Sequence, residues 1–275
     1  MMFDRIIKTS LDEDMPNGDI TTAATIPEDA HAEGIFKAKA DGIICGVDII
    51  RRTFELCGGN VEVELCVHDG DCIRKGDTIA RISGNARTIL MGERTALNLM
   101  QRASGIATAT RAACDAVKGS KAHIADTRKT MPGLRILDKY AVRAGGGTNH
   151  RFGLSDGILI KDNHISAAGG ISNAVRSAKA FAPHTLKIEV ETENLNQVKE
   201  ALEAGADIIM LDNMDCGQMK QAVDYIDGRA ITEASGNMGE RDLKKVAETG
   251  VDIISVGALT HSVKALDISL KFSVR

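Results

Sequence analysis

Positively charged side chains are concentrated in two short segments near the middle of the chain. The first segment, residues 126–135, places three cations within eight positions, Arg128 and Lys129 among them. The second segment follows a run of glycines and contains His150 and Arg151. Arginine offers a planar fork that matches carboxylate and phosphate oxygens, whereas lysine offers a point charge. The two segments therefore predict a binding site for a substrate with several negative charges.

The rest of the composition shows that this positive charge is local. The formal net charge is -4, aromatic residues make up 3% of the chain, and tryptophan is absent, so a nucleic-acid-binding surface is not expected. The six cysteines form no C-x-x-C pair, which indicates reduced thiols rather than a zinc site. The first eleven residues do not resemble a targeting peptide, and no apolar run is long enough to cross a membrane. We therefore expect a cytoplasmic protein that binds neither nucleic acid nor membrane.

The elements that would position the cations change in kind near residue 115. Before this point, helices are expected at residues 48–56 and 87–102, the first ended by two glycines. The segment 61–67 alternates apolar and charged residues, which predicts a strand with one solvent-exposed face. The strands expected in this region are residues 32–40, 42–46, 61–67 and 78–82.

After residue 115, apolar runs alternate with helical stretches such as residues 194–204, 217–227 and 241–249. Near-continuous apolar strands separated by helices indicate a parallel sheet that is buried on both faces. Because there are about six such runs rather than eight, we expect an incomplete or open barrel. The runs are residues 123–126, 157–161, 186–191, 207–212, 230–235 and 252–257.

Residue types suited to chemistry follow the ends of these runs. Lys161, Glu191 and Asp212 end three of them. Parallel barrels build their sites from the carboxyl ends of several strands. Glu191 and Asp212 suit Mg²⁺, which binds through one or two carboxylates together with substrate phosphates. Glycine-containing turns before helices, at Gly236 and Gly257, can hold a phosphate with backbone amides.

Each of these residues also has a plain structural interpretation. Glu191 could pair with Lys187, and Asp212 could begin the next helix as its N-cap. His164 is as well explained by a structural role as by a functional one. Lys161 could form a Schiff base, but the surrounding cations favour a protonated side chain that binds an anion.

In their order along the chain, these motifs resemble the quinolinate phosphoribosyltransferase family. The resemblance covers almost the whole sequence, and Lys161 in its LIKDNH context separates the chain from a paralogous group linked to molybdenum-transport operons. One departure is Asn237, where the family usually has glycine, although Asn tolerates left-handed backbone better than most residues. The matching motifs are residues 18–22, 92–98, 126–135, 149–151, 159–164, 189–191, 210–213, 233–236 and 255–260.

The resemblance implies an α/β fold of the type II phosphoribosyltransferase kind. Its N-terminal α/β sandwich would span residues 1–112, and its C-terminal open (β/α) barrel of about six parallel strands would span residues 113–264. The tail, residues 265–275, would pack back on the first domain. The resemblance also implies a homodimer in which Arg94 reaches the neighbouring subunit's site, and it leaves a hexamer of dimers open.

The implied activity is that of a pentosyltransferase in de novo NAD synthesis. Quinolinate and phosphoribosyl pyrophosphate would give nicotinate mononucleotide, pyrophosphate and CO₂, with Mg²⁺ required and no covalent enzyme intermediate. Two alternatives stay open at this point: a related phosphoribosyltransferase that acts on another acidic heterocycle, and a non-catalytic sensor of phosphorylated metabolites.

The resemblance also implies individual roles for the motif residues. The quinolinate carboxylates would be held by Arg128, His150, Arg151 and Lys161. Lys129 and Thr130 would lie near the ribosyl phosphates, while Glu191 and Asp212 would face the ribose and the metal. Lys129, Lys161, Glu191 and Asp212 would form the catalytic set. The 5′-phosphate would be held by Ser235, Gly236, Asn237, Gly257, Ala258 and Leu259.

Overall fold

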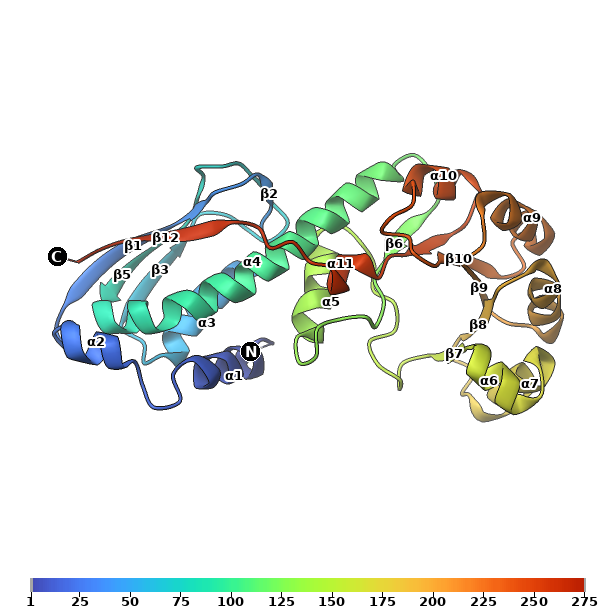
Figure 1. Cartoon of the computed structure of the whole chain (residues 1–275), viewed down its shortest axis with the longest axis horizontal. Helices are drawn as coiled ribbons and strands as arrows, with labels where there is room; N and C mark the ends of the chain where they lie inside the picture. The colour runs from blue at the N-terminus through green and yellow to red at the C-terminus, as the bar shows by residue number, and fades with distance from the viewer. Residues whose placement is uncertain (1, 275) are drawn as a thin grey trace. The chain divides into compact units, whose positions relative to one another are not determined.

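A computed structural model describes residues 2–274 of the chain and divides it into two units (Figure 1). Unit 1 consists of the residues up to 111, residues 131–146 and the residues from 262 onward. Unit 2 consists of residues 112–130 and 147–261. The segment 131–146 therefore groups with unit 1, whereas the sequence-based division placed it in the barrel.

Unit 1 contains a four-stranded antiparallel sheet with the order β12-β1-β5-β3. The C-terminal strand β12 pairs with β1 over its whole length, from Ala38 opposite Ile268 to Ala32 opposite Val274. The tail of the chain thus forms an edge strand of this sheet. The strands are β1 (His31–Ala38), β3 (Val61–Leu65), β5 (Thr78–Asn85) and β12 (Ile268–Val274), and β2 (Gly42–Ile43) pairs separately with β4 (Cys72–Ile73).

Helices cover one face of this sheet. Phe36 of the sheet packs in one apolar cluster with Phe54 of α3 (Val47–Leu56) and Met100 of α4 (Ala86–Ala116). A second cluster joins α1 (Asp4–Asp14) to α5 (Arg135–Ala144), which is why the segment 131–146 belongs to unit 1. The short helix α2 (Ile20–Thr25) begins at Asp19, whose side chain accepts the backbone N–H of Thr22.

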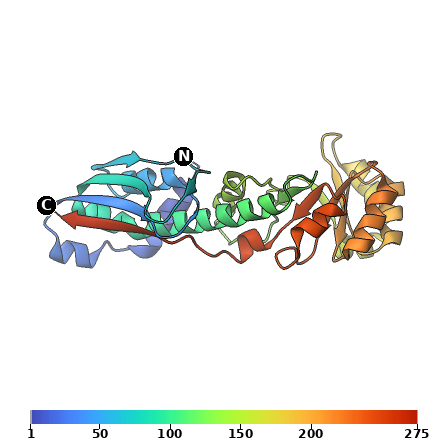
Figure 2. The same ribbon diagram turned by 90° about the horizontal axis from the view of Figure 1, so that it is seen from above.

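Helix α4 continues well beyond residue 102, where the sequence pattern predicted its end. Figure 2 shows it as one unbroken helix. A Cβ at Gly105 would lie 2.2 Å from the carbonyl oxygen of Lys264, so glycine is needed there for the close approach of the chain. The glycine that suggests a helix end in the sequence is therefore a packing position inside the helix.

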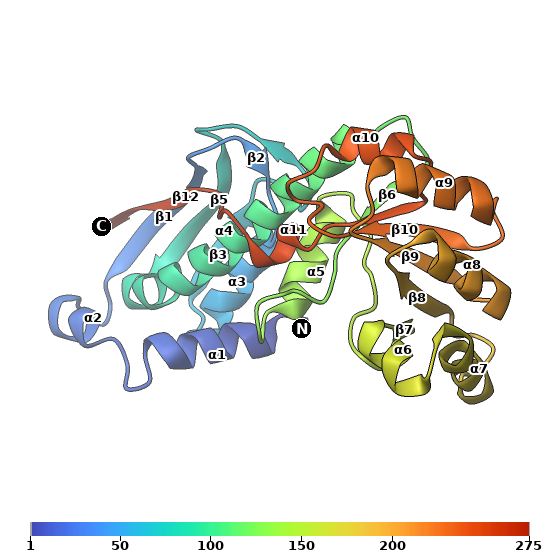
Figure 3. The same cartoon turned by 45° about the vertical axis from the view of Figure 1, so that its right-hand side comes forward.

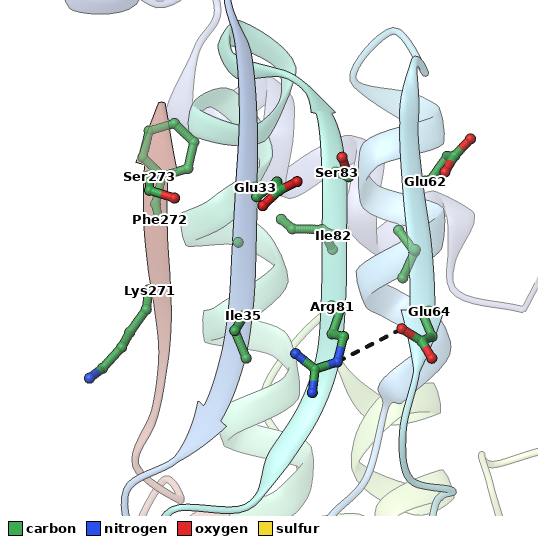
Figure 4. Close-up of a pocket in the computed structure, with 12 residues that line it drawn as sticks. Glu33, Ile35, Glu62, Glu64, Arg81, Ile82, Ser83, Lys271, Phe272 and Ser273 are labelled. Atoms are coloured by element: carbon green, nitrogen blue, oxygen red, sulfur yellow. Dashed lines mark ion pairs between the residues drawn. The ribbon is translucent and has the colours of Figure 1, made fainter. Parts of the chain in front are cut away.

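The opposite face of the same sheet carries polar side chains (Figure 4). Glu62 and Glu64 of β3 are exposed, as the alternating pattern predicted. Arg81 of β5 lies 3.9 Å from Glu64, and this face borders a groove of about 630 Å³. None of the site residues predicted from the sequence lines this groove.

Unit 2 contains six parallel strands in the order β6-β11-β10-β9-β8-β7. β6 and β7 lie at the two edges, so the sheet is open, and the expected α/β fold with six parallel strands is confirmed. The strands are β6 (His123–Ala125), β7 (Ile158–Ile160), β8 (Ile188–Thr192), β9 (Ile208–Asp212), β10 (Ile231–Ser235) and β11 (Ile253–Ser255).

Helices follow the strands of unit 2, and Figure 3 shows α7, α8 and α9 side by side along the sheet. Alternate strand residues such as Val190, Leu211 and Ala234 pack into the apolar core of this unit. No helix among residues 2–274 is long and apolar enough to cross a membrane. The helices are α6 (Asp162–Ala168), α7 (Ile171–Phe181), α8 (Leu195–Ala204), α9 (Cys216–Ile226), α10 (Leu243–Glu248) and α11 (Ala258–His261).

Candidate active site

A cavity of about 520 Å³ lies at the carboxyl ends of the strands in unit 2. Strand residues alternate between the two faces of a sheet. Because Val190 and Leu211 face the apolar core, their neighbours Glu191 and Asp212 point to the cavity side. The lining comprises Thr127, Arg128, Lys129, His150, Arg151, Leu159, Lys161, Glu191, Met210, Asp212, Asn213, Glu233, Ser235, Gly236, Asn237 and Ser255.

Some of the residues predicted from the sequence lie elsewhere. Arg94 is an exposed residue of α4 in unit 1. Leu259 is 5% exposed and packs in the core of unit 2, so its side chain is a core residue. Thr130, Gly257 and Ala258 belong to unit 2 but are not among the lining residues. Gly257 still lies next to Lys129, since a Cβ there would be 3.1 Å from the Cδ of that lysine.

Lys161 and Glu191 form an ion pair at the ends of β7 and β8. The Nζ of Lys161 lies 2.6 Å from Oε2 of Glu191. Glu191 is therefore paired with Lys161 rather than with Lys187. A carboxylate at this distance favours the charged form of the amine, which suits anion binding better than Schiff-base chemistry.

His164 has a structural role. Its Nδ1 accepts the backbone N–H of Lys161 at 3.0 Å, and the two residues form a capping box at the start of α6. This bond fixes the backbone of Lys161 where β7 passes into the helix.

Asp212 is left at the rim of the cavity because another residue begins the next helix. Asp215 is the N-cap of α9, and its side chain accepts the backbone N–H of Gln218 at 2.8 Å. The carboxylate of Asp212 instead accepts the side-chain amide of Asn213 at 2.7 Å. The interpretation of Asp212 as a helix cap is therefore wrong.

The turn after β10 has left-handed backbone at two successive residues. Gly236 has φ +96° and Asn237 has φ +51°. A Cβ at Gly236 would lie 2.7 Å from the backbone nitrogen of Asn213, so this position requires glycine. Asn237 adopts a conformation that asparagine tolerates, which explains how the chain accommodates the change from the usual glycine.

The two cationic segments found in the sequence are joined by Asp126, a buried residue that follows β6. One of its oxygens accepts the backbone N–H of His150 at 2.9 Å, and the other accepts the side-chain amide of Asn149 at 2.6 Å. Because Arg128 and Arg151 follow these residues closely in the chain, the Asp126 bonds hold both cations at one end of the sheet.

His150 lies between two buried glutamates. Its Nε2 is 3.1 Å from Oε2 of Glu189 and 3.6 Å from Oε1 of Glu233. Burial and the nearby Glu189 raise the pKa of Glu233 to about 7, although His150 acts in the opposite direction. A carboxyl group at the base of the cavity is therefore partly protonated near neutral pH.

Models of two domains from one protein family match this chain. The model described as "Quinolinate phosphoribosyl transferase, N-terminal domain" matches residues 19–104, and the model of the C-terminal domain of the same enzyme matches residues 106–271. The chain belongs to the quinolinate phosphoribosyltransferase family.

Relatives of this family are similar over nearly their whole length. The chain is 50% identical to the chloroplastic nicotinate-nucleotide pyrophosphorylase [carboxylating] of Arabidopsis thaliana, covering 97% of this chain and 81% of the relative. It is 48% identical to the probable enzyme of that name from Bacillus subtilis (strain 168), covering 94% and 89%. The solved structure of the nicotinate-nucleotide pyrophosphorylase from Francisella tularensis has a TM-score of 0.94 at 40% identity, covering 99% of this chain and 96% of that one.

Within this quinolinate phosphoribosyltransferase chain, Arg151 experiences opposing electrostatic effects. Burial lowers the pKa of Arg151, and the neighbouring Arg128 lowers it further, whereas Glu189 and Asp156 raise it. The Nη1 of Arg151 donates to the carbonyl oxygen of Gly157 at 3.1 Å. The acidic residues beside the cationic segments therefore help to keep the guanidinium charged.

Glu189 and Glu233 were missed as functional residues in the sequence, although both lie in family motifs. The signal was available in the spacing, because Glu189 and Glu191 are two positions apart on one strand and so face the same side. Glu233 and Ser235 have the same relationship on β10. A polar residue two positions before a strand-end residue therefore predicts a second layer beneath the site.

Proposed function

We propose that this chain transfers the phosphoribosyl group of phosphoribosyl pyrophosphate to quinolinate, with release of pyrophosphate and CO₂. The product is nicotinate mononucleotide, an intermediate of NAD synthesis. The observation that carries this proposal is the composition of the cavity in a chain of this family. Cations, carboxylates and a left-handed glycine turn line a single cavity at one end of the sheet.

The cations suit a substrate with two carboxylates. Arg128 and Arg151 supply planar forks, and Lys161 supplies a point charge on the same cavity. The ion pair between Lys161 and Glu191 satisfies the amine before the substrate arrives. A quinolinate carboxylate would take the place of Glu191 beside this amine, which would leave the glutamate available to the ribose.

The turn formed by Ser235, Gly236 and Asn237 suits the 5′-phosphate of the second substrate. The left-handed residues turn successive backbone amides toward one side, which is a common geometry for binding anions. Lys129 adds a positive charge on the same cavity. The phosphate would thereby anchor the ribose with its C1 atom toward the ring nitrogen of quinolinate.

Glu191 and Asp212 fit a bound Mg²⁺, because both present carboxylate oxygens at neighbouring strand ends that line the cavity. When bound, Mg²⁺ would neutralise charge on the pyrophosphate group. The same carboxylates would face the ribose, where positive charge develops as the bond to pyrophosphate breaks.

The loss of CO₂ leaves an electron pair on a ring carbon next to the ring nitrogen. After ribosyl transfer this nitrogen is positively charged, and the nearby Arg and Lys side chains add to its effect. We therefore assign to the protein the tasks of positioning and electrostatic stabilisation, without a covalent intermediate on any side chain.

Incubation of the purified protein with phosphoribosyl pyrophosphate, Mg²⁺ and one pyridine carboxylate at a time tests the assignment. Quinolinate should give nucleotide and CO₂ in equal amounts, and nicotinate should give neither. Nucleotide formation from nicotinate without CO₂ would contradict the proposal, as would a protein that binds quinolinate but forms no product.

A further inference from the structure

The cluster of His150, Glu189 and Glu233 is not accounted for by the roles proposed above. Glu189 is 4% exposed and Glu233 is 1% exposed, and both approach the same nitrogen of the imidazole. Among the described residues, Oε1 of each glutamate has no hydrogen-bond partner. Two dehydrated carboxylates around one ring edge are costly unless a proton or a cation lies between them.

The other edge of the imidazole determines which of these the cluster can hold. The backbone N–H of Arg151 donates to Nδ1 of His150 at 2.7 Å. A ring nitrogen that accepts a hydrogen bond carries no proton, so in neutral histidine the proton lies on Nε2. Nε2 then donates to Glu189, whose oxygen is 3.1 Å away.

This tautomer excludes a metal ion at the cluster, even though the spacing would suit one. One atom from each of the three residues lies within 4.8 Å of the others. A metal needs the lone pair of Nε2, which would move the proton to Nδ1. That proton would then oppose the N–H of Arg151. The cluster is therefore suited to sharing a proton, and the more distant Glu233 is the natural carrier of it.

The hydrogen bonds of His150 also show what the residue holds in place. Its backbone N–H is bound by Asp126 at 2.9 Å, its Nε2 by Glu189, and its Nδ1 binds the backbone of Arg151. Both ring nitrogens thus make contacts within the protein. Neither contact is to a group that a substrate would replace, because both partners are buried or belong to the backbone.

We infer that His150 is a positioning residue, fixed by Glu189 and acting on quinolinate through Arg151, rather than a direct ligand of the substrate. The inference rests on the proposed function, since it concerns how that substrate is held. It replaces the role in carboxylate binding that the family resemblance implied for His150. It also gives Glu189 and Glu233 a task beneath the cavity: Glu189 orients the imidazole, and Glu233 carries the proton that allows the two carboxylates to lie together.

A double-mutant cycle distinguishes an indirect role from a direct one. His150→Leu should lower kcat/KM for quinolinate by roughly 10- to 100-fold through misplacement of Arg151. In an Arg151→Ala background, the same substitution should lower it by less than about threefold, because the residue through which it acts is already lost. Independent, multiplying losses would show that His150 binds the substrate itself and would overturn the inference.

Two further variants keep the test decisive if His150→Leu does not fold. The side-chain oxygen of His150→Asn can accept the Arg151 amide, so this variant should be more active than His150→Leu and should reproduce the cycle. Equal losses for Asn and Leu would count against the role of the Nδ1 bond. The KM for phosphoribosyl pyrophosphate should stay within about threefold in each variant, which would separate a local effect from general unfolding.

The roles of the two glutamates are tested by amide substitution. Glutamine resembles a protonated glutamate, so Glu233→Gln should retain at least about tenfold more activity than Glu189→Gln. Equal losses would contradict the assignment of the proton to Glu233. Equilibrium dialysis with Mn²⁺ and Zn²⁺ gives a second measurement: a tightly bound ion that disappears in His150→Leu would show a metal site instead.

Failure of this inference is distinguishable from failure of the proposed function. The release of CO₂ from quinolinate by the wild-type protein is measured first. If CO₂ is absent, the proposed function fails and the inference fails with it. If CO₂ is present and the losses at His150 and Arg151 multiply, the function stands and only the positioning role is wrong.

Discussion

The carboxylate of Asp126 accepts a hydrogen bond from the backbone N–H of His150 at 2.9 Å. This bond joins the end of β6 to the loop that follows α5, two places that are far apart in the sequence. Since Arg128 lies just after one partner and Arg151 just after the other, a single buried carboxylate sets the spacing of two cations in the cavity. The charge of Asp126 is also one of the few negative charges buried beside this positive site.

Replacement of Asp126 by alanine should therefore impair both stability and substrate binding. The backbone N–H of His150 and the amide of Asn149 would lose a buried acceptor, at a cost of about 1–3 kcal/mol in the free energy of unfolding. The KM for quinolinate should rise more than the KM for phosphoribosyl pyrophosphate. Urea unfolding and steady-state kinetics measure these effects, with Asp224→Ala on the exposed side of α9 as the matched control.

The ion pair of Lys161 with Glu191 leads to a prediction about chemistry. Lys161→Met keeps most of the length of the side chain but removes the charge, so the release of CO₂ should fall by roughly 100-fold or more. Borohydride treatment of the wild-type protein during turnover should produce no adduct, because the charged amine is not nucleophilic. A reduced adduct on Lys161, located by peptide mass spectrometry, would rule out the mechanism without a covalent intermediate.

Several parts of this arrangement could be predicted from the sequence. The strands of unit 2 are apolar runs whose ends carry Lys161, Glu191 and Asp212, so both the open parallel sheet and one rim of polar residues follow from the pattern. Glu189 and Glu233 could not be recognised in the same way, because they occupy strand interiors and gain their meaning only from His150, which comes from a distant loop. The end of α4 was misjudged because Gly105 suggests a helix end, whereas its reason is the tertiary contact with Lys264.

The buried Glu233 should make stability depend on pH. Its pKa in the folded protein is about 7, above the ordinary value of 4.5, so the folded state binds this proton more tightly than the unfolded state. The resulting stabilisation is fully present below about pH 4.5 and is lost as the pH rises toward and through 7. Glu233→Gln cannot titrate, so the difference in urea midpoint between wild type and this variant should change across that window. A constant difference from pH 5 to pH 8 would contradict the raised pKa.

Subunit mixing tests the proposed homodimer with a shared site. Arg94 is exposed on α4, and the family resemblance implies that it reaches the site of the neighbouring subunit. Arg94→Ala and Lys161→Ala should each be nearly inactive, yet a mixed dimer would contain one site with both residues intact. After random exchange of subunits, about a quarter of wild-type activity should return. Recovery should be absent when either variant is mixed with itself, and its absence from the hybrid would argue against Arg94 serving a neighbouring site.

The turn at Gly236 and Asn237 offers a comparison between two adjacent left-handed residues. Gly236→Ala would place a Cβ against the backbone of Asn213 and would add the strain of a left-handed alanine, about 1–2 kcal/mol before any clash. The KM for phosphoribosyl pyrophosphate should therefore rise by at least roughly tenfold, while the affinity for quinolinate, measured alone by calorimetry, should change little. Asn237→Gly keeps the same backbone conformation and restores the residue usual in the family, so it should lie close to wild type in both measurements. If Gly236→Ala weakened quinolinate and phosphoribosyl pyrophosphate equally, the turn would not be a dedicated phosphate site.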